Sequence, residues 1–124
     1  MDRVFLQIEL SEDGDINILG NLTIRINAFG DVNADGNVIR LAHVNIGGVT
    51  NIRGSSAQDL VFFFRSAFAR RVTVNLAGGN DLLFSFSSFY GHKATFKGGA
   101  GTDALSISLN VFTFPLITDF EDLF

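Results

Sequence analysis

The strongest constraint in this sequence is a fixed spacing of acidic and amide side chains. Counted back from Asp103 in steps of 22 residues, the chain carries Asp81, Asp59, Asn37 and Asp15. No insertion or deletion interrupts this series. A repeat of about 20 to 50 residues is typical of solenoids, in which each coil buries its apolar side chains against the next coil. The spacing therefore predicts about five coils of 22 residues.

Composition favours strands within each coil. The 124 residues include 14 Phe and 13 Gly but a single Pro, and Glu and Lys are few. Aromatic and β-branched residues are enriched in strands. Segments such as 6–10 and 22–26 alternate apolar and polar residues, which is the period of a strand with one buried face. We expect a single all-β domain over residues 1–124, with three short strands in each coil joined by tight turns.

Matching positions of the repeat define columns of stacked side chains. One column, expected inside, consists of Ile24, Ile46, Phe68, Tyr90 and Phe112. A second column, also expected inside, consists of Ile8, Ile52, Val74 and Phe96. A third is polar and expected outside, with opposite charges on neighbouring coils, and consists of Glu9, Asp31, Arg53, Asn75, Lys97 and Asp119. Neighbouring coils would lie about 4.8 Å apart, as paired strands do.

These columns predict a parallel β-helix, a solenoid in which each sheet grows by pairing between coils. We favour right-handed winding, because parallel crossover connections have that hand. One competing interpretation is an amphipathic helix over 58–71, where Leu60, Phe63 and Phe64 have helical spacing. We prefer strands, because Asp59–Phe64 lies in register with Asp81–Phe86, which has a strand pattern.

The C-terminal residues 114–124 are expected to form a cap on the last coil. Pro115 interrupts the strand pattern, and residues 118–121 read Thr-Asp-Phe-Glu, which fits a helix capping box. A short helix or a folded-over tail there would lay Phe120, Leu123 and Phe124 on the last coil. Without such a cover, the open end of a solenoid presents unpaired strand edges.

Phenylalanine usage predicts an apolar outer face. If Val61, Phe63, Leu83, Leu105 and Ile107 point inward, then the side chains that point outward are Leu60, Phe62, Phe64, Leu82, Phe84 and Phe86. The reverse phase in the fourth coil would bury two of these rings and expose Leu83. The first phase gives an aromatic patch on the order of several hundred Å², larger than a soluble monomer usually shows. We expect Phe62, Phe64, Phe84 and Phe86 to form a self-association interface, most simply in a dimer. Stacking of coil ends is the alternative contact.

Charge and composition disfavour several other functions. The formal net charge is −4, whereas nucleic-acid binders normally present a basic face. The chain has no cysteine, which excludes disulfides, thiolate zinc sites and cysteine nucleophiles. No apolar run reaches the roughly 18 residues of a membrane span. The opening residues, Met-Asp-Arg, do not begin a signal peptide.

Catalytic constellations are also sparse. The two histidines, His43 and His92, fall in different columns and have no evident Ser or Asp partner. We therefore expect a protein that is not an enzyme. A basic corner of Arg65, Arg70, Arg71, His92 and Lys93 could bind an anionic glycan or phosphate, although a solvated polar edge is the simpler interpretation.

Residues 98–106 read Gly-Gly-Ala-Gly-Thr-Asp-Ala-Leu-Ser and match the nonapeptide GGxGxDxUx at every fixed position. In this stretch the chain resembles the RTX family of glycine- and aspartate-rich bacterial repeat modules. Earlier coils keep only parts of the motif, and one motif per coil departs from the tandem nonapeptides of that family. The resemblance implies an exported bacterial module, located outside the cell, that binds calcium along one aspartate edge.

The candidate calcium ligands are Asp59, Asp81 and Asp103. Stacked about 5 Å apart, three carboxylates would repel one another, and a cation would remove that repulsion. Calcium takes about six to eight oxygen ligands, which the turn carbonyls could complete. Alternatively, each Asp accepts hydrogen bonds from its own glycine turn, as Asn37 could do without charge. Calcium is the one cofactor that the sequence suggests.

Two functional classes follow from these observations. The first is a non-catalytic structural or interaction solenoid that associates with itself, or with a glycan or protein partner, through the Phe-rich face or the coil ends. The alternative is a calcium-binding, exported repeat module similar to RTX domains. The two differ in whether folding or stability depends on calcium.

Overall fold

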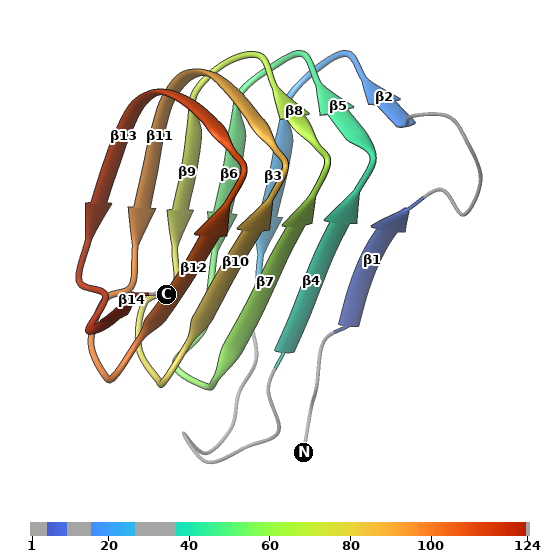
Figure 1. Cartoon of the computed structure of the whole chain (residues 1–124). Helices are drawn as coiled ribbons and strands as arrows, with labels where there is room; N and C mark the ends of the chain where they lie inside the picture. The colour runs from blue at the N-terminus through green and yellow to red at the C-terminus, as the bar shows by residue number, and fades with distance from the viewer. Residues whose placement is uncertain (1–4, 10–15, 27–36, 124) are drawn as a thin grey trace.

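The computed structural model describes residues 5–9, 16–26 and 37–123 of the chain. All regular elements in these ranges are strands, and the strands of neighbouring coils pair in parallel. Together they form a β-solenoid of about four turns with a spacing of about 22 residues. Figure 1 shows the coils stacked side by side, with β1 at one end of the stack and β13 at the other. The predicted fold class is confirmed.

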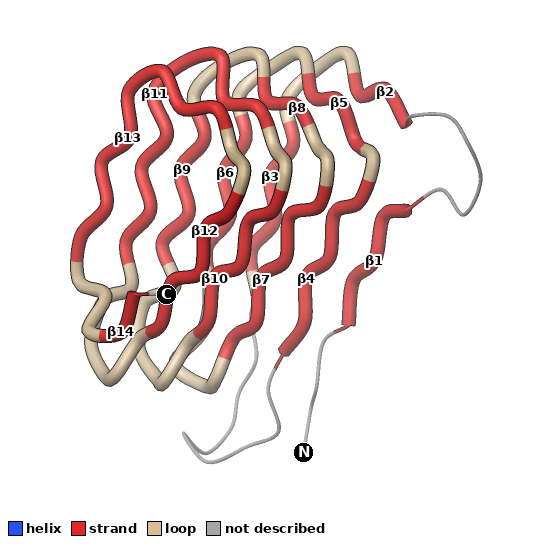
Figure 2. Tube along the Cα trace, viewed as in Figure 1, coloured by secondary structure: helices blue, strands red, loops and turns tan. Residues whose placement is uncertain are grey.

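Two long sheets form the walls of the solenoid, with loops at the corners (Figure 2). The first sheet has the strand order β1 (Phe5–Glu9), β4 (Asn37–Ala42), β7 (Asp59–Phe64), β10 (Leu82–Phe86), β12 (Ala104–Ser108) and β14 (Asp122–Leu123). The second sheet contains β2 (Ile16–Ile18), β5 (Val44–Ile46), β8 (Ala67–Phe68), β11 (Phe89–Lys97), β9 (Val72–Asn75), β6 (Thr50–Arg53), β3 (Leu22–Arg25) and β13 (Val111–Thr118). Each coil has the three strand segments that were expected. The second and third segments, such as β5 and β6, belong to the same sheet.

The spacing of 22 residues holds from Asn37 to Phe112, where for example Asn37 pairs with Asp59 and Leu60 with Leu82. Before Asn37 it fails, since Phe5 pairs with Val38. The first coil is longer in two places. Glu9 and Ile16 are seven residues apart, whereas the residues that pair with them, Ala42 and Val44, are two apart. Arg25 and Asn37 are twelve apart, whereas their partners Arg53 and Asp59 are six apart. Both additions include residues outside the described ranges. Asp15 also lies outside these ranges.

The longer first coil changes the membership of the predicted columns. The stacking of Ile46, Phe68, Tyr90 and Phe112 is confirmed. The assignment of Ile24 to that column was wrong, because Ile18 pairs with Ile46 and occupies its place. Ile24 instead pairs with Ile52 and extends the column of Val74 and Phe96. Ile8 was expected in this second column but pairs with Leu41 in the first sheet.

The polar column is correct only in its middle. Arg53, Asn75 and Lys97 are neighbours in successive coils, as expected. Lys97 lies opposite Thr118 rather than Asp119, because the pairing of β11 with β13 shifts by one residue between Tyr90 and Lys93. Glu9 pairs with Ala42, and Asp31 lies outside the described residues.

The core lies between the two sheets and combines aliphatic side chains with a ladder of aromatic rings. The rings of Phe68, Tyr90 and Phe112 stack nearly parallel, with successive centroids 5.1 and 4.7 Å apart. From the first sheet, Phe63 packs edge-on against Phe68 at 5.1 Å. Ring pairs at such separations add to the hydrophobic gain of burial. This ladder connects the two walls and spans three coils.

The inward phase of the first sheet is confirmed. Val61, Phe63, Leu83 and Leu105 are buried, although Ile107 is 38% exposed in the last coil. Ser85 also points inward, where its hydroxyl lies 2.7 Å from the buried Tyr90 hydroxyl. An inward serine is therefore tolerated because it has a hydrogen-bond partner in the core.

Neither of the two helices considered from the sequence is present among the described residues. Residues 58–71 contain β7 and β8, as the preferred strand interpretation predicted. Residues 114–124 contain most of β13 and β14, and at Asp119 the chain turns with a positive φ of 60°. Pairing with β11 and β12 supplies hydrogen bonds that an isolated helical turn could not match. The tail does fold over the last coil, where Phe120 packs against the core but Leu123 is 67% exposed.

We expect Phe68→Ala to lower the free energy of unfolding by about 3 to 5 kcal/mol, since it leaves a cavity within the aromatic ladder. Phe89 neighbours it on the same sheet but is 49% exposed, so Phe89→Ala should cost less than about 1 kcal/mol. Urea denaturation followed by circular dichroism measures both. An equal decrease in the free energy of unfolding for the two variants would contradict the burial of Phe68 and the exposure of Phe89.

Candidate functional site

The outer side of the first sheet carries a contiguous apolar patch. Alternation along β7 and β10 places every second residue outside, and these residues are Leu60, Phe62, Phe64, Leu82, Phe84 and Phe86. We call this set the Phe face. All six are only partly buried, whereas the intervening Val61, Phe63 and Leu83 are fully buried. The four predicted interface residues thus lie together on one surface.

The rings of the Phe face hold one another in place. Phe84 is central, with its centroid 6.2 Å from that of Phe62 and 5.4 Å from that of Phe64. Phe62 and Phe64 stack with an interplanar angle of 7°. Arg40 borders the face, with its guanidinium carbon 4.6 Å from the centroid of Phe64. This packing preorganises a flat aromatic surface, which reduces the entropy lost on binding.

The Phe face is limited to two coils. Toward the N-terminus, Phe62 and Phe64 pair with Arg40 and Ala42. Toward the C-terminus, Phe84 and Phe86 pair with Ser106 and Ser108. Smaller or polar residues therefore frame the aromatic centre, as they do in many protein interfaces.

The predicted aspartate edge is a buried column. Asn37 and Asp59 begin strands of the first sheet, Asp81 and Asp103 directly precede the next two strands, and each of the four is at most 3% exposed. Such burial is costly for charged groups unless hydrogen bonds or protonation compensate it. The three candidate calcium ligands therefore line up as expected, but within the wall rather than on an open edge.

The carboxylates of Asp81 and Asp103 accept backbone N–H groups of the preceding coil, whereas Asp59 Oδ1 accepts from the Asn37 side-chain Nδ2 at 2.9 Å. The Asp59 N–H donates to Asp81 Oδ1 at 2.7 Å, and the Asp81 N–H donates to Asp103 Oδ1 at 2.9 Å. At the last coil the Asp103 N–H donates to Glu121 Oε2 at 2.9 Å. Bonding within the residue's own turn, which the sequence suggested, is present for Asp59, which accepts from the Ser55 N–H at 2.7 Å.

Burial makes these carboxyl groups weak acids. The pKa of Asp81 is raised to about 8, chiefly by desolvation and also by the nearby charges of Asp59 and Asp103, against a hydrogen bond from the Asp59 backbone that lowers it. Desolvation likewise raises the pKa values of Asp59 and Asp103 above the ordinary value. The Oδ2 atoms of Asp81 and Asp103 are buried and accept no hydrogen bond from described residues. A proton or a cation would satisfy these oxygens.

Two glycines make room for the column. A Cβ at Gly54 would lie 2.5 Å from Asp59 Oδ2, and one at Gly98 would lie 2.8 Å from Asp103 Oδ2. Both distances are too short for a real side chain. Within the described ranges, three or more His, Asp or Glu side chains do not converge on a common point where they could hold a metal ion.

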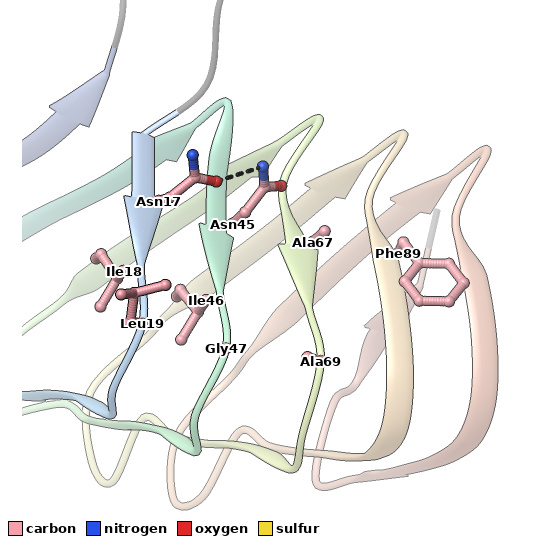
Figure 3. Close-up of a pocket in the computed structure, with 9 residues that line it drawn as sticks. All are labelled: Asn17, Ile18, Leu19, Asn45, Ile46, Gly47, Ala67, Ala69 and Phe89. Atoms are coloured by element: carbon pink, nitrogen blue, oxygen red, sulfur yellow. Dashed lines mark hydrogen bonds between the residues drawn. The ribbon is translucent and has the colours of Figure 1, made fainter.

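A shallow groove on the outer side of the second sheet was not expected from the sequence (Figure 3). Its volume is about 350 Å³. Small residues, among them Gly47, Ala67 and Ala69, line it between Leu19, which is 91% exposed, and Phe89. Asn17 and Asn45 also line it, and the Asn45 Nδ2 donates to the Asn17 Oδ1 at 3.0 Å. Recurrent small residues at repeat positions are the signal that could have indicated it.

The remaining candidates lie apart from the groove. The predicted basic corner is exposed and consists of Arg65, Arg70, Arg71, His92 and Lys93. Val72 pairs with Ala94, so Arg71 and Lys93 lie on adjacent coils. His43 lies at a turn between β4 and β5 with a positive φ of 58°. None of these residues lines the groove.

Comparison with known proteins does not identify a family for this chain. No protein-family model, curated protein or solved structure matches the chain. Among the described residues, no helix is long and apolar enough to cross a membrane. The resemblance to RTX repeats therefore depends on residues 98–106.

The raised pKa of Asp81 predicts an unusual dependence of stability on pH. Because the folded state holds this proton more tightly than the unfolded chain, the contribution is complete below about pH 4 and lost as pH rises through about 8. Each unit of pKa difference corresponds to about 1.4 kcal/mol. Asp81→Asn should flatten this slope, since the amide keeps an acceptor for the Asp59 N–H. Urea denaturation at several pH values tests this, and stability that increases with pH would contradict it.

Proposed function

We propose that this protein is a non-catalytic structural or interaction solenoid that associates with a second copy through the Phe face. The observation that carries this proposal is the contiguous, partly exposed cluster of four phenylalanine rings on a flat sheet. Fully burying an exposed phenylalanine side chain contributes roughly 1.5 to 3 kcal/mol. Because these four rings are already partly buried, each would contribute only part of that amount, and together they favour association.

A two-fold dimer suits the shape of this surface. Sheets pack face to face about 10 Å apart, and a two-fold contact applies the same patch to itself. Arg40 at the border of the face could contact rings of the opposing copy as it contacts Phe64. A protein or glycan partner would use the same rings, so it is an outcome that the experiment below must distinguish.

The non-catalytic assignment is supported by where the titratable groups lie. The carboxyl groups with raised pKa values are buried in the aspartate column. The residues that line the groove on the second sheet include no titratable side chain. Active sites usually combine a concave pocket with perturbed acids or bases, and here these two features are separate.

We expect the wild type to be a dimer and Phe62→Ser/Phe84→Ser to be a folded monomer. Leu19→Ser/Phe89→Ser is the matched control, because it also removes two exposed apolar side chains but on the other sheet. Size-exclusion chromatography with light scattering gives the masses, and circular dichroism checks folding. A wild type that stays monomeric at high concentration would refute self-association through the Phe face. The Phe face would then be available to a different partner.

Calcium binding is a second candidate function, in an exported module similar to RTX domains. Two observations favour it: the motif at residues 98–106 and the buried Oδ2 atoms of Asp81 and Asp103, which accept no hydrogen bond from described residues. A calcium ion at this column would displace the protons that the raised pKa values retain.

For this second candidate, calcium should raise the melting temperature relative to chelator, and Asp81→Asn should abolish the rise. Binding to the folded state stabilises it in proportion to the logarithm of ligand concentration. Thermal denaturation with calcium, magnesium or chelator provides the measurement. A rise that persists in Asp81→Asn would exclude the aspartate column as the site.

A further inference from the structure

The last coil exposes residues of a kind that the inner coils bury. Large apolar side chains with high exposure are concentrated there: Ile107, Leu109, Val111, Phe114, Leu116 and Leu123. Phe112 and Ile117, which end the two core columns of the second sheet, are only partly buried, whereas Tyr90 and Phe96 before them are fully buried. Although Phe120 packs against it, the core is therefore only partly covered at this end.

This end also has unpaired strand edges. β13 pairs with β11 on one side, and no described strand occupies its other side. β14 covers only Ala104 and Leu105 of β12. Between the two sheets lies a hollow of about 500 Å³, lined by Leu105, Ile107, Ile117 and Leu123. Unpaired edges with an apolar space between them are the features that each coil presents to the next coil.

The opposite end of the stack carries a matching set. β2 and β3 are the terminal strands of the second sheet, and their outer sides have no partner among the described strands. Ile18 and Ile24 on these strands begin the two columns that Phe112 and Ile117 end. Figure 1 shows β2 and β3 at one end of the solenoid and β13 at the other.

We propose that a second copy of this chain docks on the C-terminal coil head to tail, with its β2 and β3 beside β13. In the second sheet, the parallel pairing and both apolar columns then continue from one copy to the next. In the first sheet, β14 already pairs with Ala104 and Leu105, so the next copy's β1 could pair only beside residues 106–108. Phe112 would lie beside the next copy's Ile18, Ile117 beside its Ile24, and Thr118 beside its Arg25. This contact uses a different surface from the Phe face, so it does not depend on the proposed dimer.

Charge selects this orientation over a tail-to-tail contact. The C-terminal coil carries exposed Asp119, Glu121 and Asp122. Two such ends facing each other would bring like charges together, which is unfavourable. Head to tail, the exposed Arg25 of one copy would instead approach the acidic residues after Thr118 of the other. The contact is heterologous and does not close, so its product is a linear assembly rather than a defined dimer.

Cross-linking tests the orientation directly, because the chain has no cysteine of its own. Two single variants, Arg25→Cys and Thr118→Cys, are prepared on the Phe62→Ser/Phe84→Ser background, which removes the proposed lateral contact. Paired strands place Cα atoms about 4.8 Å apart, which is within disulfide range. Mild oxidation of the mixture should yield covalent dimers, and each variant alone should not. Dimers from Thr118→Cys alone would overturn the proposal in favour of a tail-to-tail contact.

Charge substitution at Thr118 gives a second test on the same background. This residue lies between the chain's own Lys97 and the position proposed for the next copy's Arg25. By the usual strength of cross-strand charge pairs, Thr118→Glu should tighten association about two- to fivefold and Thr118→Lys should weaken it similarly. The matched controls Thr73→Glu and Thr73→Lys, in the middle of the same sheet, should change nothing. Sedimentation velocity at low salt measures the association. A constant monomer mass at all concentrations, or equal responses to Glu and Lys at Thr118, would overturn the proposal.

Discussion

The solenoid depends on polar side chains that accept backbone N–H groups where the pairing of strands is interrupted at the corners. Along the first sheet, the carboxylates of Asp81 and Asp103 accept the N–H groups of Asp59 and Asp81. A second ladder at another corner repeats this pattern: the N–H groups of Val44, Ser66 and Ser88 donate to Ser66 Oγ, Ser88 Oγ and Asn110 Oδ1. A buried N–H without an acceptor costs free energy. These side chains therefore set the length of each coil, since a single added residue would move an acceptor away from its donor.

The two faces of β7 and β10 use phenylalanine in different ways. Inside, Phe63 contacts Phe68, and the ladder of Phe68, Tyr90 and Phe112 connects the coils through stacked rings. Outside, Phe62, Phe64 and Phe84 contact one another without a covering layer. The inner rings contribute to the stability of the fold, because large buried side chains make most of the packing contacts. The outer rings contribute little to it, which is why they can be removed to test association without unfolding the chain.

The proposed contacts differ in geometry and in their response to salt. The Phe face is apolar and bordered by Arg40, so a contact there should be insensitive to ionic strength. The coil ends carry Arg25 at one end and exposed carboxylates at the other, so a contact there should weaken as salt screens these charges. A lateral two-fold contact gives a closed dimer, whereas repeated end contacts extend the rod. A chain with both contacts would form paired rods, because neither surface overlaps the other.

From the sequence alone, the parallel β-solenoid, its 22-residue spacing between Asn37 and Phe112, the column of Ile46, Phe68, Tyr90 and Phe112, and the outward Phe62 and Phe84 were predicted correctly. Local patterns suffice for these features, because the side-chain period of a strand and the repeat length determine which residues stack. The tertiary structure alone decided the column of Ile24, the shift of Lys97 onto Thr118, the strand at residues 122–123 and the groove beside Phe89. It also decided that the Asp81 and Asp103 carboxylates bond to the neighbouring coil. Additions to the first coil and a bulge in β11 change the register without altering the local pattern, and only contacts between coils reveal them.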